Sequence, residues 1–332
     1  MSIYDHMKKF SGGPVKEWGG GVDWAELKNQ PADEGDRPKL PPLRNAEKTM
    51  FRISVEYEEA EAGVRWEDKF QHFLAQKNVD RVAGIVVGVW SPDDSSVSSD
   101  RVLKLIAKAA PKLPGLRAVF VGDIMAEECE ISWITQGDVG ALLKAYPALE
   151  HLGVRGGEKL RFDVDRHDRL KTLVIESGGL PRSAVHGVLA ADLPALEHLE
   201  LWLGTEGYGA DTTPEDFAPL LAGTKFPKLK YLGLRDSEIA DDLAAVLANA
   251  PVLKKLKTLD LSMGTLSDEG AKALLAGKLV KKLEKLDVHY HFCTPAVVKQ
   301  LKALGPKIDA SKPQKPEDWG GGESMRFVAV SE

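Results

Sequence analysis

One aliphatic pattern recurs along this chain, and it constrains the fold more than any other feature. Aliphatic residues occupy the first, fourth and sixth positions of a short segment, as Leu256, Leu259 and Leu261 do. The pattern occurs eight times, with starts 21 to 34 residues apart, at Val82, Leu116, Leu149, Leu170, Leu196, Leu229, Leu256 and Leu283. All 24 positions are aliphatic in a chain that is 43% hydrophobic, so composition alone does not produce the pattern.

The spacing predicts how each repeat folds. The fourth and sixth positions of a strand point to the same side, and most intervals continue with a helical apolar stripe, as in residues 241–250 and 268–277. A buried aliphatic side chain contributes roughly 1.5–3 kcal/mol, whereas ordering each residue costs about 1–2 kcal/mol, so one repeat cannot fold alone. The pattern resembles the irregular leucine-rich repeats of ribonuclease inhibitor. We therefore expect an α/β fold, a right-handed leucine-rich repeat solenoid (horseshoe) of about eight repeats with N- and C-terminal caps.

Composition divides the chain into four expected parts. They are an extended or partly disordered N-terminal tail (1–48), an N-terminal cap of a strand and a helix (49–78), the repeat array (79–310), and a C-terminal tail with a terminal strand (311–332). The 21-residue interval after Leu149 shows no helical stripe, so we expect no helix there. Trp18 and Trp319, in two similar Gly-rich segments, are expected to anchor the tails.

Charge and cysteine content narrow the possible partners and compartments. The net charge of -6 argues against nucleic acid and anionic membranes as partners, because both require dense basic patches. The two cysteines, Cys129 and Cys293, are far apart and do not indicate a disulfide framework. The chain shows neither a secretory signal nor an apolar run of about 18–20 residues. We therefore expect a cytoplasmic protein, and no motif indicates its oligomeric state.

The concave face of such a solenoid is the expected binding surface. The third, fifth and seventh positions of each repeat point to this face, away from the buried leucines. Its candidate partner-binding residues are Arg155, Glu176, His198, Glu200, Trp202, Tyr231, Arg235, Asp260, Asp287 and His289. Tryptophan, tyrosine and arginine dominate binding hot spots, so we expect a non-enzymatic scaffold that holds a protein or peptide around Trp202. In the alternative, Trp202 is covered by the loop 204–216 or by the tails.

A metal-binding or hydrolase-like protein is the competing interpretation. His198, Glu200, Asp260, Asp287 and His289 could form a cluster in the concave face. His289, His291 and Cys293 also alternate along one extended segment, and imidazole and thiolate suit zinc. However, the chain contains no phosphate loop and no nucleophile, zinc or redox motif. Acidic neighbours make Cys129 a poor nucleophile. We expect no catalytic residue and no cofactor.

Several segments resemble an uncharacterised bacterial family of leucine-rich repeat proteins. They lie at residues 122–138, 196–209 and 256–270 and at the two ends of the chain. The resemblance covers nearly the whole chain apart from the tails, and it implies no enzymatic activity. Members of that family are encoded beside radical-SAM and ATP-grasp-type enzymes. The resemblance therefore implies an accessory binding component of a bacterial modification pathway.

Overall fold

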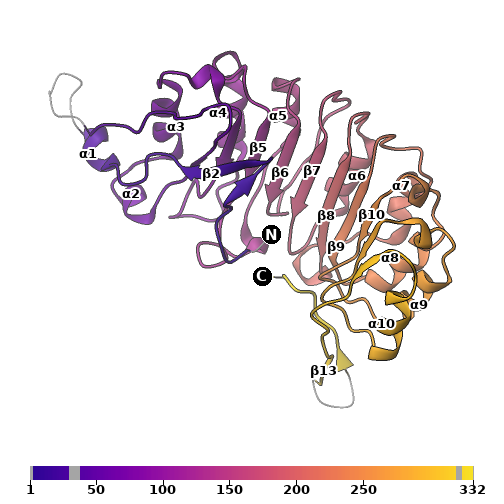
Figure 1. Ribbon diagram of the computed structural model, residues 1–332. Coiled ribbons are helices and arrows are strands. Elements are labelled where there is room, and N and C mark those ends of the chain that lie inside the picture. The colour runs from indigo at the N-terminus through magenta and orange to yellow at the C-terminus, as the bar shows by residue number, and fades with distance from the viewer. Residues whose placement is uncertain (1–2, 30–37, 319–323, 332) are drawn as a thin grey trace. The chain divides into compact units, whose positions relative to one another are not determined.

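The computed structural model describes residues 3–29, 38–318 and 324–331. The chain divides into two compact units, Met1–Val164 and Asp165–Glu332, here called the N-terminal and C-terminal units. Both units consist of parallel strands connected by helices and short turns (Figure 1). No α-helix lies between Arg155 and Thr172, as predicted, and the boundary between the units falls in this stretch.

The strands of the N-terminal unit follow one another in chain order. They are β1 (Lys9–Phe10), β2 (Gly13–Glu17), β3 (Met50–Ile53), β4 (Gly84–Val87), β5 (Ala118–Val121) and β6 (His151–Arg155). β1 and β2 are antiparallel, and the pairs from β2 to β6 are parallel. The helices are α1 (Trp24–Asn29), α2 (Tyr57–Glu61), α3 (Trp66–Leu74), α4 (Asp100–Lys108) and α5 (Gly140–Ala145). The strand and the helix expected over residues 49–78 correspond to β3 and α3, and helix α2 lies between them.

The N-terminal segment differs from the expected extended or partly disordered tail. Its described residues contain β1, β2 and α1, and both Trp18 and Trp24 are buried. Trp18 packs edge-on against Phe73, with ring centroids 5.2 Å apart, and its indole N–H donates to the carbonyl of Pro41 at 3.1 Å. Buried aromatic area offsets the entropy of ordering this Gly-rich segment. Trp18 is thus an anchor, while Trp319 lies outside the described residues.

The C-terminal unit repeats one strand-and-helix module. Its parallel strands are β7 (Thr172–Glu176), β8 (His198–Gly204), β9 (Tyr231–Ser237), β10 (Thr258–Asp260), β11 (Lys285–Asp287) and β12 (Lys307–Asp309). Its helices are α6 (Arg182–Ala190), α7 (Ala218–Leu221), α8 (Ala240–Leu247), α9 (Asp268–Ala276) and α10 (Pro295–Lys302). Helices α7 to α10 lie on one side of strands β8 to β10 (Figure 1).

The chain ends differently from the sequence prediction. In place of one terminal strand, the short strands β13 (Glu317–Asp318) and β14 (Ser324–Met325) pair with each other. Residues 326–331 continue as irregular chain. Short 3₁₀ turns complete the structure, at Val79–Arg81, Ala110–Lys112, Ile131–Trp133, Glu206–Tyr208, Pro214–Phe217, Pro251–Lys254 and Val280–Lys282.

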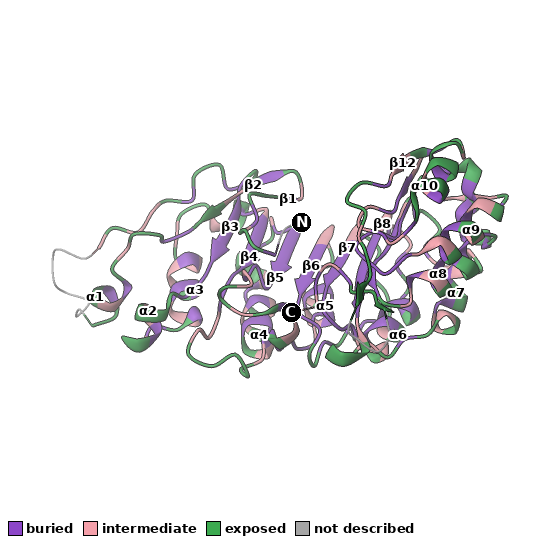
Figure 2. Cartoon of the chain, turned by 90° about the horizontal axis from the view of Figure 1, so that it is seen from below, coloured by how far each residue is buried: buried purple, intermediate pink, exposed green. Residues whose placement is uncertain are grey.

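The repeated aliphatic residues form the core of both units. All 24 are buried, and the most exposed, Leu256, is 6% accessible. Fourth-position residues pair directly across neighbouring strands, from Ile85 through Val119 to Leu152 and from Leu173 through to Leu286. Strands β4 to β8 appear as buried in Figure 2. The register is the one that the repeat spacing predicts, and the fold is an α/β solenoid of leucine-rich repeats.

Residues with left-handed backbone conformation connect neighbouring repeats of the C-terminal unit. Asp236, Met263 and Tyr290 occupy equivalent positions after their strands, with φ of 50°, 70° and 58°. Their backbone N–H groups donate to the next repeat, at the carbonyls of Ser262 (2.8 Å), His289 (2.9 Å) and Ser311 (2.9 Å). Backbone hydrogen bonds therefore link these repeats without a specialised side chain.

Candidate functional site

The face of the C-terminal sheet opposite the leucines carries a row of carboxylates. The register pairs Glu200 with Gly233, Gly233 with Asp260, Asp260 with Asp287, and Asp287 with Asp309. We call this surface, made of the third, fifth and seventh positions of strands β7 to β12, the polar sheet face. Strands in a sheet lie about 4.8 Å apart, so such carboxylates need cations or hydrogen-bond donors between them.

Glu200 lies at the centre of the first hydrogen-bond network on this face. Its Oε1 accepts from the indole N–H of Trp202 at 2.8 Å and from the guanidinium of Arg235. Burial by itself raises the pKa of Glu200, but a hydrogen bond from His198 and the charge of Arg235 lower it to about 2. The Arg235 guanidinium also lies 5.2 Å from the centroid of the Trp202 ring, in a cation–π arrangement. Glu200 is therefore a fixed anion and not a proton carrier at neutral pH.

Tyr231 extends this network to the next carboxylate. Its hydroxyl donates to Asp260 at 2.6 Å, and its ring stacks on the imidazole of His198 with centroids 3.9 Å apart. Gly233 makes room for this arrangement, because a Cβ there would lie 3.1 Å from the Tyr231 ring and 3.3 Å from Glu200. Burial and the neighbouring carboxylates raise the pKa of the Tyr231 hydroxyl well above its usual range, so it acts as a hydrogen-bond donor.

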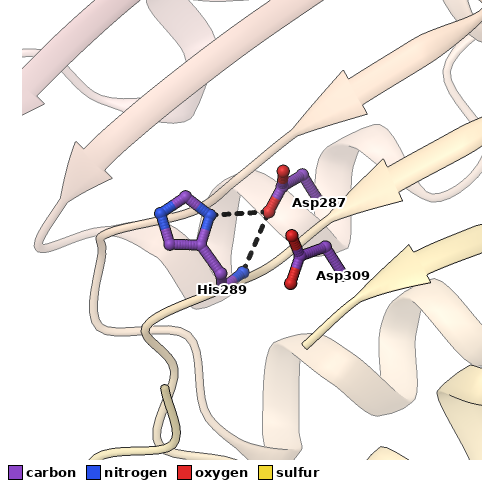
Figure 3. Close-up of side chains that lie close together, drawn as sticks. All are labelled: Asp287, His289 and Asp309. Carbon is purple, nitrogen blue, oxygen red and sulfur yellow. Dashed lines mark hydrogen bonds and ion pairs between the residues drawn. The ribbon is translucent and has the colours of Figure 1, made fainter. Parts of the chain in front are cut away.

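A second cluster lies at strands β11 and β12 and is drawn in Figure 3. The Nδ1 atom of His289 lies 2.8 Å from a carboxylate oxygen of Asp287, and the other oxygen accepts from Lys285 at 2.8 Å. Burial raises the pKa of Asp287, but the hydrogen bonds from His289 and Lys285 outweigh it and hold that pKa well below its usual range. Asp309 faces the same pair, and one ligand-type atom from each of Asp287, His289 and Asp309 lies within 4.8 Å of the others.

Sequence reasoning missed Asp309 because its strand lacks the aliphatic triplet. The first and sixth positions of that repeat are Gly305 and Ala310, and only Ile308 at the fourth position fits. A weaker signal was present, since Lys307-Ile308-Asp309 repeats the Lys-Leu-Asp of residues 285–287 and the Thr-Leu-Asp of residues 258–260.

Apart from His289, the predicted seventh-position side chains do not present the exposed surface that the sequence predicts. Trp202 and Glu176 are 0% exposed and Arg235 is 8% exposed. Trp202 is held by its indole hydrogen bond and covered by Arg235, so it offers no surface for a hot-spot contact. Arg155 belongs to the N-terminal unit, where it is buried and donates to the carbonyl of Ile124 at 2.7 Å. Of the predicted residues, His198, Tyr231 and His289 are half-buried and reach the surface.

The predicted grouping of His289, His291 and Cys293 is not formed. His291 is buried, where its Nδ1 accepts from the backbone N–H of Cys293 at 3.0 Å and its Nε2 lies 3.3 Å from the carbonyl of Ala310. Burial raises the pKa of Cys293 to about 12. His291 and Cys293 therefore stabilise the turn. Burial and the charges of two glutamates likewise raise the pKa of Cys129, in agreement with the expected low reactivity.

The end of the chain lies along the ends of strands β9 to β11. Residues 326–331, here called the C-terminal strap, donate from Arg326 to Asp241 at 2.8 Å and from the N–H of Ala329 to the carbonyl of Met263 at 2.8 Å. The N–H of Val330 donates to Asp236 at 3.0 Å, and Val328 and Val330 are buried. A tail therefore covers the strand ends next to the polar sheet face.

Asp236 lies under this strap and should make the stability of the C-terminal unit depend on pH. The side chain is 0% exposed, its Oδ2 atom has no hydrogen-bond partner, and burial raises its pKa well above the usual value. Because the folded-state pKa exceeds the unfolded one, the group's contribution to stability is complete at low pH and is lost as pH rises through the folded pKa. Asparagine tolerates the left-handed backbone and carries no charge.

We therefore expect Asp236→Asn to stabilise the C-terminal unit at pH 8 by on the order of 1–3 kcal/mol, because a neutral amide costs less to bury than an ionised carboxylate. The gain should shrink at pH 4.5, where the wild-type carboxyl is protonated. Guanidinium unfolding at both pH values measures the difference, and an equal gain at both would contradict this account of Asp236.

Comparisons with known proteins identify related structures. No protein-family model and no curated protein matches the sequence. A Bacteroides fragilis protein of known crystal structure is 35% identical, with a TM-score of 0.74, over 80% of this chain and 74% of that one. An internalin from Listeria monocytogenes is 15% identical, with a TM-score of 0.34, over 81% of this chain and 75% of that one. None of the helices in the described residues has the length and apolar character needed to cross a membrane.

Proposed function

The chain belongs to the same protein family as the Bacteroides fragilis protein, and we propose that it is a non-enzymatic scaffold that binds a protein or peptide through the polar sheet face. Stacked repeats present extended surfaces of the kind used for binding. One observation carries the proposal. The buried carboxylates of this face accept hydrogen bonds from the charged and aromatic side chains around them and so fix the positions of these side chains. By resemblance to the uncharacterised bacterial family, we place the scaffold in a bacterial modification pathway as an accessory component.

Buried anions orient the side chains that reach the surface of this face. His198, Lys285 and His289 keep 32%, 37% and 22% of their side chains accessible, and each lies within 3.3 Å of a buried carboxylate. Side chains that are already ordered lose little entropy on binding, which favours affinity. The mixture of imidazole, ammonium and carboxylate groups fits a polar or charged segment of a partner.

The hydrolase-like alternative has less support from the electrostatics. An efficient general acid or base has a pKa near the working pH. The pKa of Glu200 is lowered to about 2 and that of Asp287 lies well below its usual range. Both carboxylates are paired with cations, Arg235 and Lys285 respectively. They are therefore suited to orient other side chains and poorly suited to exchange protons at neutral pH.

A double variant of the polar sheet face tests the proposal. We expect His198→Ala/Lys285→Ala to weaken capture of a partner from a native bacterial lysate by at least about tenfold, which corresponds to a joint loss of about 1.4 kcal/mol of binding free energy. Quantitative proteomics of the captured proteins measures the change. Lys272→Ala is the matched control, because Lys272 is exposed on helix α9, on the other side of the same unit.

The control variant should retain the partner, provided that circular dichroism shows all variants to be folded. Equal capture by wild type and by the double variant would overturn the assignment of binding to this face.

A further inference from the structure

The last two strands of the solenoid bring together three side chains with metal-ligand chemistry. Asp287 on β11 and Asp309 on β12 are direct neighbours in the parallel register, and His289 lies two residues beyond Asp287. Their side chains converge at one point of the polar sheet face (Figure 3). One imidazole nitrogen and two carboxylate oxygens, one from each residue, all lie within 4.8 Å of one another.

We propose that Asp287, His289 and Asp309 bind one divalent transition-metal ion of the zinc type. Imidazole suits zinc and related metals, whereas magnesium and calcium prefer sites made only of oxygen ligands. Three protein ligands leave the fourth tetrahedral position for water or for a group from a bound partner. The site is independent of the proposed scaffold function, because an isolated chain can bind the ion without a partner.

The pair of His289 and Asp287 requires little rearrangement to accept an ion, while the carboxylate of Asp309, whose ligand atom lies within 4.8 Å of theirs, has to move closer. Ligand atoms on a tetrahedral zinc ion with bonds of about 2.05 Å lie about 3.3 Å apart. The Nδ1 atom of His289 and the nearest oxygen of Asp287 are 2.8 Å apart, so they need to separate by only a few tenths of an ångström. The ion takes the place of the hydrogen between these two atoms. The imidazole then binds as the neutral ring with a proton on Nε2, and the proton displaced from Nδ1 passes to Nε2 or to solvent.

The surroundings orient the third ligand and supply a competing cation. Ser311 donates both its N–H (3.1 Å) and its hydroxyl (2.7 Å) to Oδ1 of Asp309, which fixes this carboxylate and leaves Oδ2 for a metal. The ammonium of Lys285 lies 2.8 Å from Asp287 and is 37% exposed, so it can move into solvent when an ion binds. Asp260, on the neighbouring strand, adds negative charge beside the cluster.

Zinc titration of the full metal-free chain, with a chromophoric chelator as competitor, tests the site. We expect one ion per chain. His289→Gln and Asp309→Asn should each weaken zinc binding by at least about 10- to 100-fold. This is the cost of losing a residue that only supports a metal ligand. Lys285→Gln should tighten binding, because it removes the competing ammonium, and no purely structural role of the cluster predicts that increase. Magnesium ions should not compete with zinc.

His198→Gln is the matched control, since His198 is a half-buried histidine of the same face that also contacts a carboxylate. It should leave zinc affinity unchanged. Absence of stoichiometric zinc binding would overturn the proposal, and so would equal affinities of wild type and Asp309→Asn. If His289→Gln fails to fold, the opposite effects of Asp309→Asn and Lys285→Gln decide the question. A wild-type chain that captures its partner but binds no zinc would reject the metal site and keep the scaffold function.

Discussion

Replacing Arg52 by methionine is expected to destabilise the N-terminal unit by about 3–5 kcal/mol. Arg52 is 4% exposed, and its guanidinium donates to the Oδ2 atom and to the carbonyl of Asp123, both at 3.0 Å. Asp123 is itself 0% exposed. Methionine fills the space of the arginine stem but leaves a buried carboxylate without its cation. Breaking a buried ion pair from one side is costly for this reason.

The loss should be concentrated at the start of the chain. Arg52 also donates to Glu17 on β2 at 2.7 Å, and Asp123 accepts from the backbone N–H of Met7 at 3.1 Å. Both contacts attach the N-terminal segment to the repeats. Hydrogen exchange followed by mass spectrometry should show faster exchange in residues 3–17 and in β3. Peptides from the C-terminal unit should exchange as in the wild type.

A second substitution distinguishes the two possible causes of the lost stability, which are the unpaired buried charge and the loss of packing. Arg52→Met/Asp123→Asn removes the unpaired anion, so it should recover part of the stability that Arg52→Met loses. Denaturant unfolding of the two variants gives the coupling energy. If the double variant is no more stable than Arg52→Met, the destabilisation does not arise from the buried carboxylate.

The repeat period made most of the architecture predictable. Leucines at the fourth and sixth positions define which side of each strand is buried, and the register then follows because equivalent positions of neighbouring repeats align. The missed elements lack this period. Strand β2 and helix α1 are held by Trp18 and Trp24 in a Gly-rich segment. Strand β12 has only Ile308 of the usual triplet.

The sequence predicted which side chains share the polar sheet face, but not how far each of them is buried. Alternation along a strand correctly indicated that Glu200, Asp260 and Asp287 share one face. Burial of the seventh position depends instead on contacts from residues far apart in sequence. One example is next to the seventh position of β9. There the backbone N–H of Val330 donates a hydrogen bond to Asp236, and the two residues are 94 apart in sequence. Such contacts leave no periodic signal, so Trp202 looked like a surface residue in the sequence.

Trp202→Ala is expected to cost about 3–5 kcal/mol of stability in the C-terminal unit. The side chain is 0% exposed, so alanine leaves a large cavity. The change also removes the indole donor to Glu200 and the ring beneath the Arg235 guanidinium. The sequence alone predicts a loss of about 2 kcal/mol or more in binding with the fold intact. The buried position of Trp202 changes this expectation to a loss of folding stability, measured by denaturant unfolding.

Trp202→Phe is the matched variant, because it keeps a six-membered aromatic ring and removes the pyrrole part of the indole with its N–H. It should cost about 1.5–3 kcal/mol, the value of a hydrogen bond to a charged group, and less than the alanine variant. The difference between the two variants then measures the packing of the remaining phenyl ring in this buried position, which includes its contact with Arg235. If Trp202→Ala instead changes stability by less than about 1 kcal/mol while partner capture is lost, Trp202 contacts the partner directly. The polar sheet face would then open to admit it.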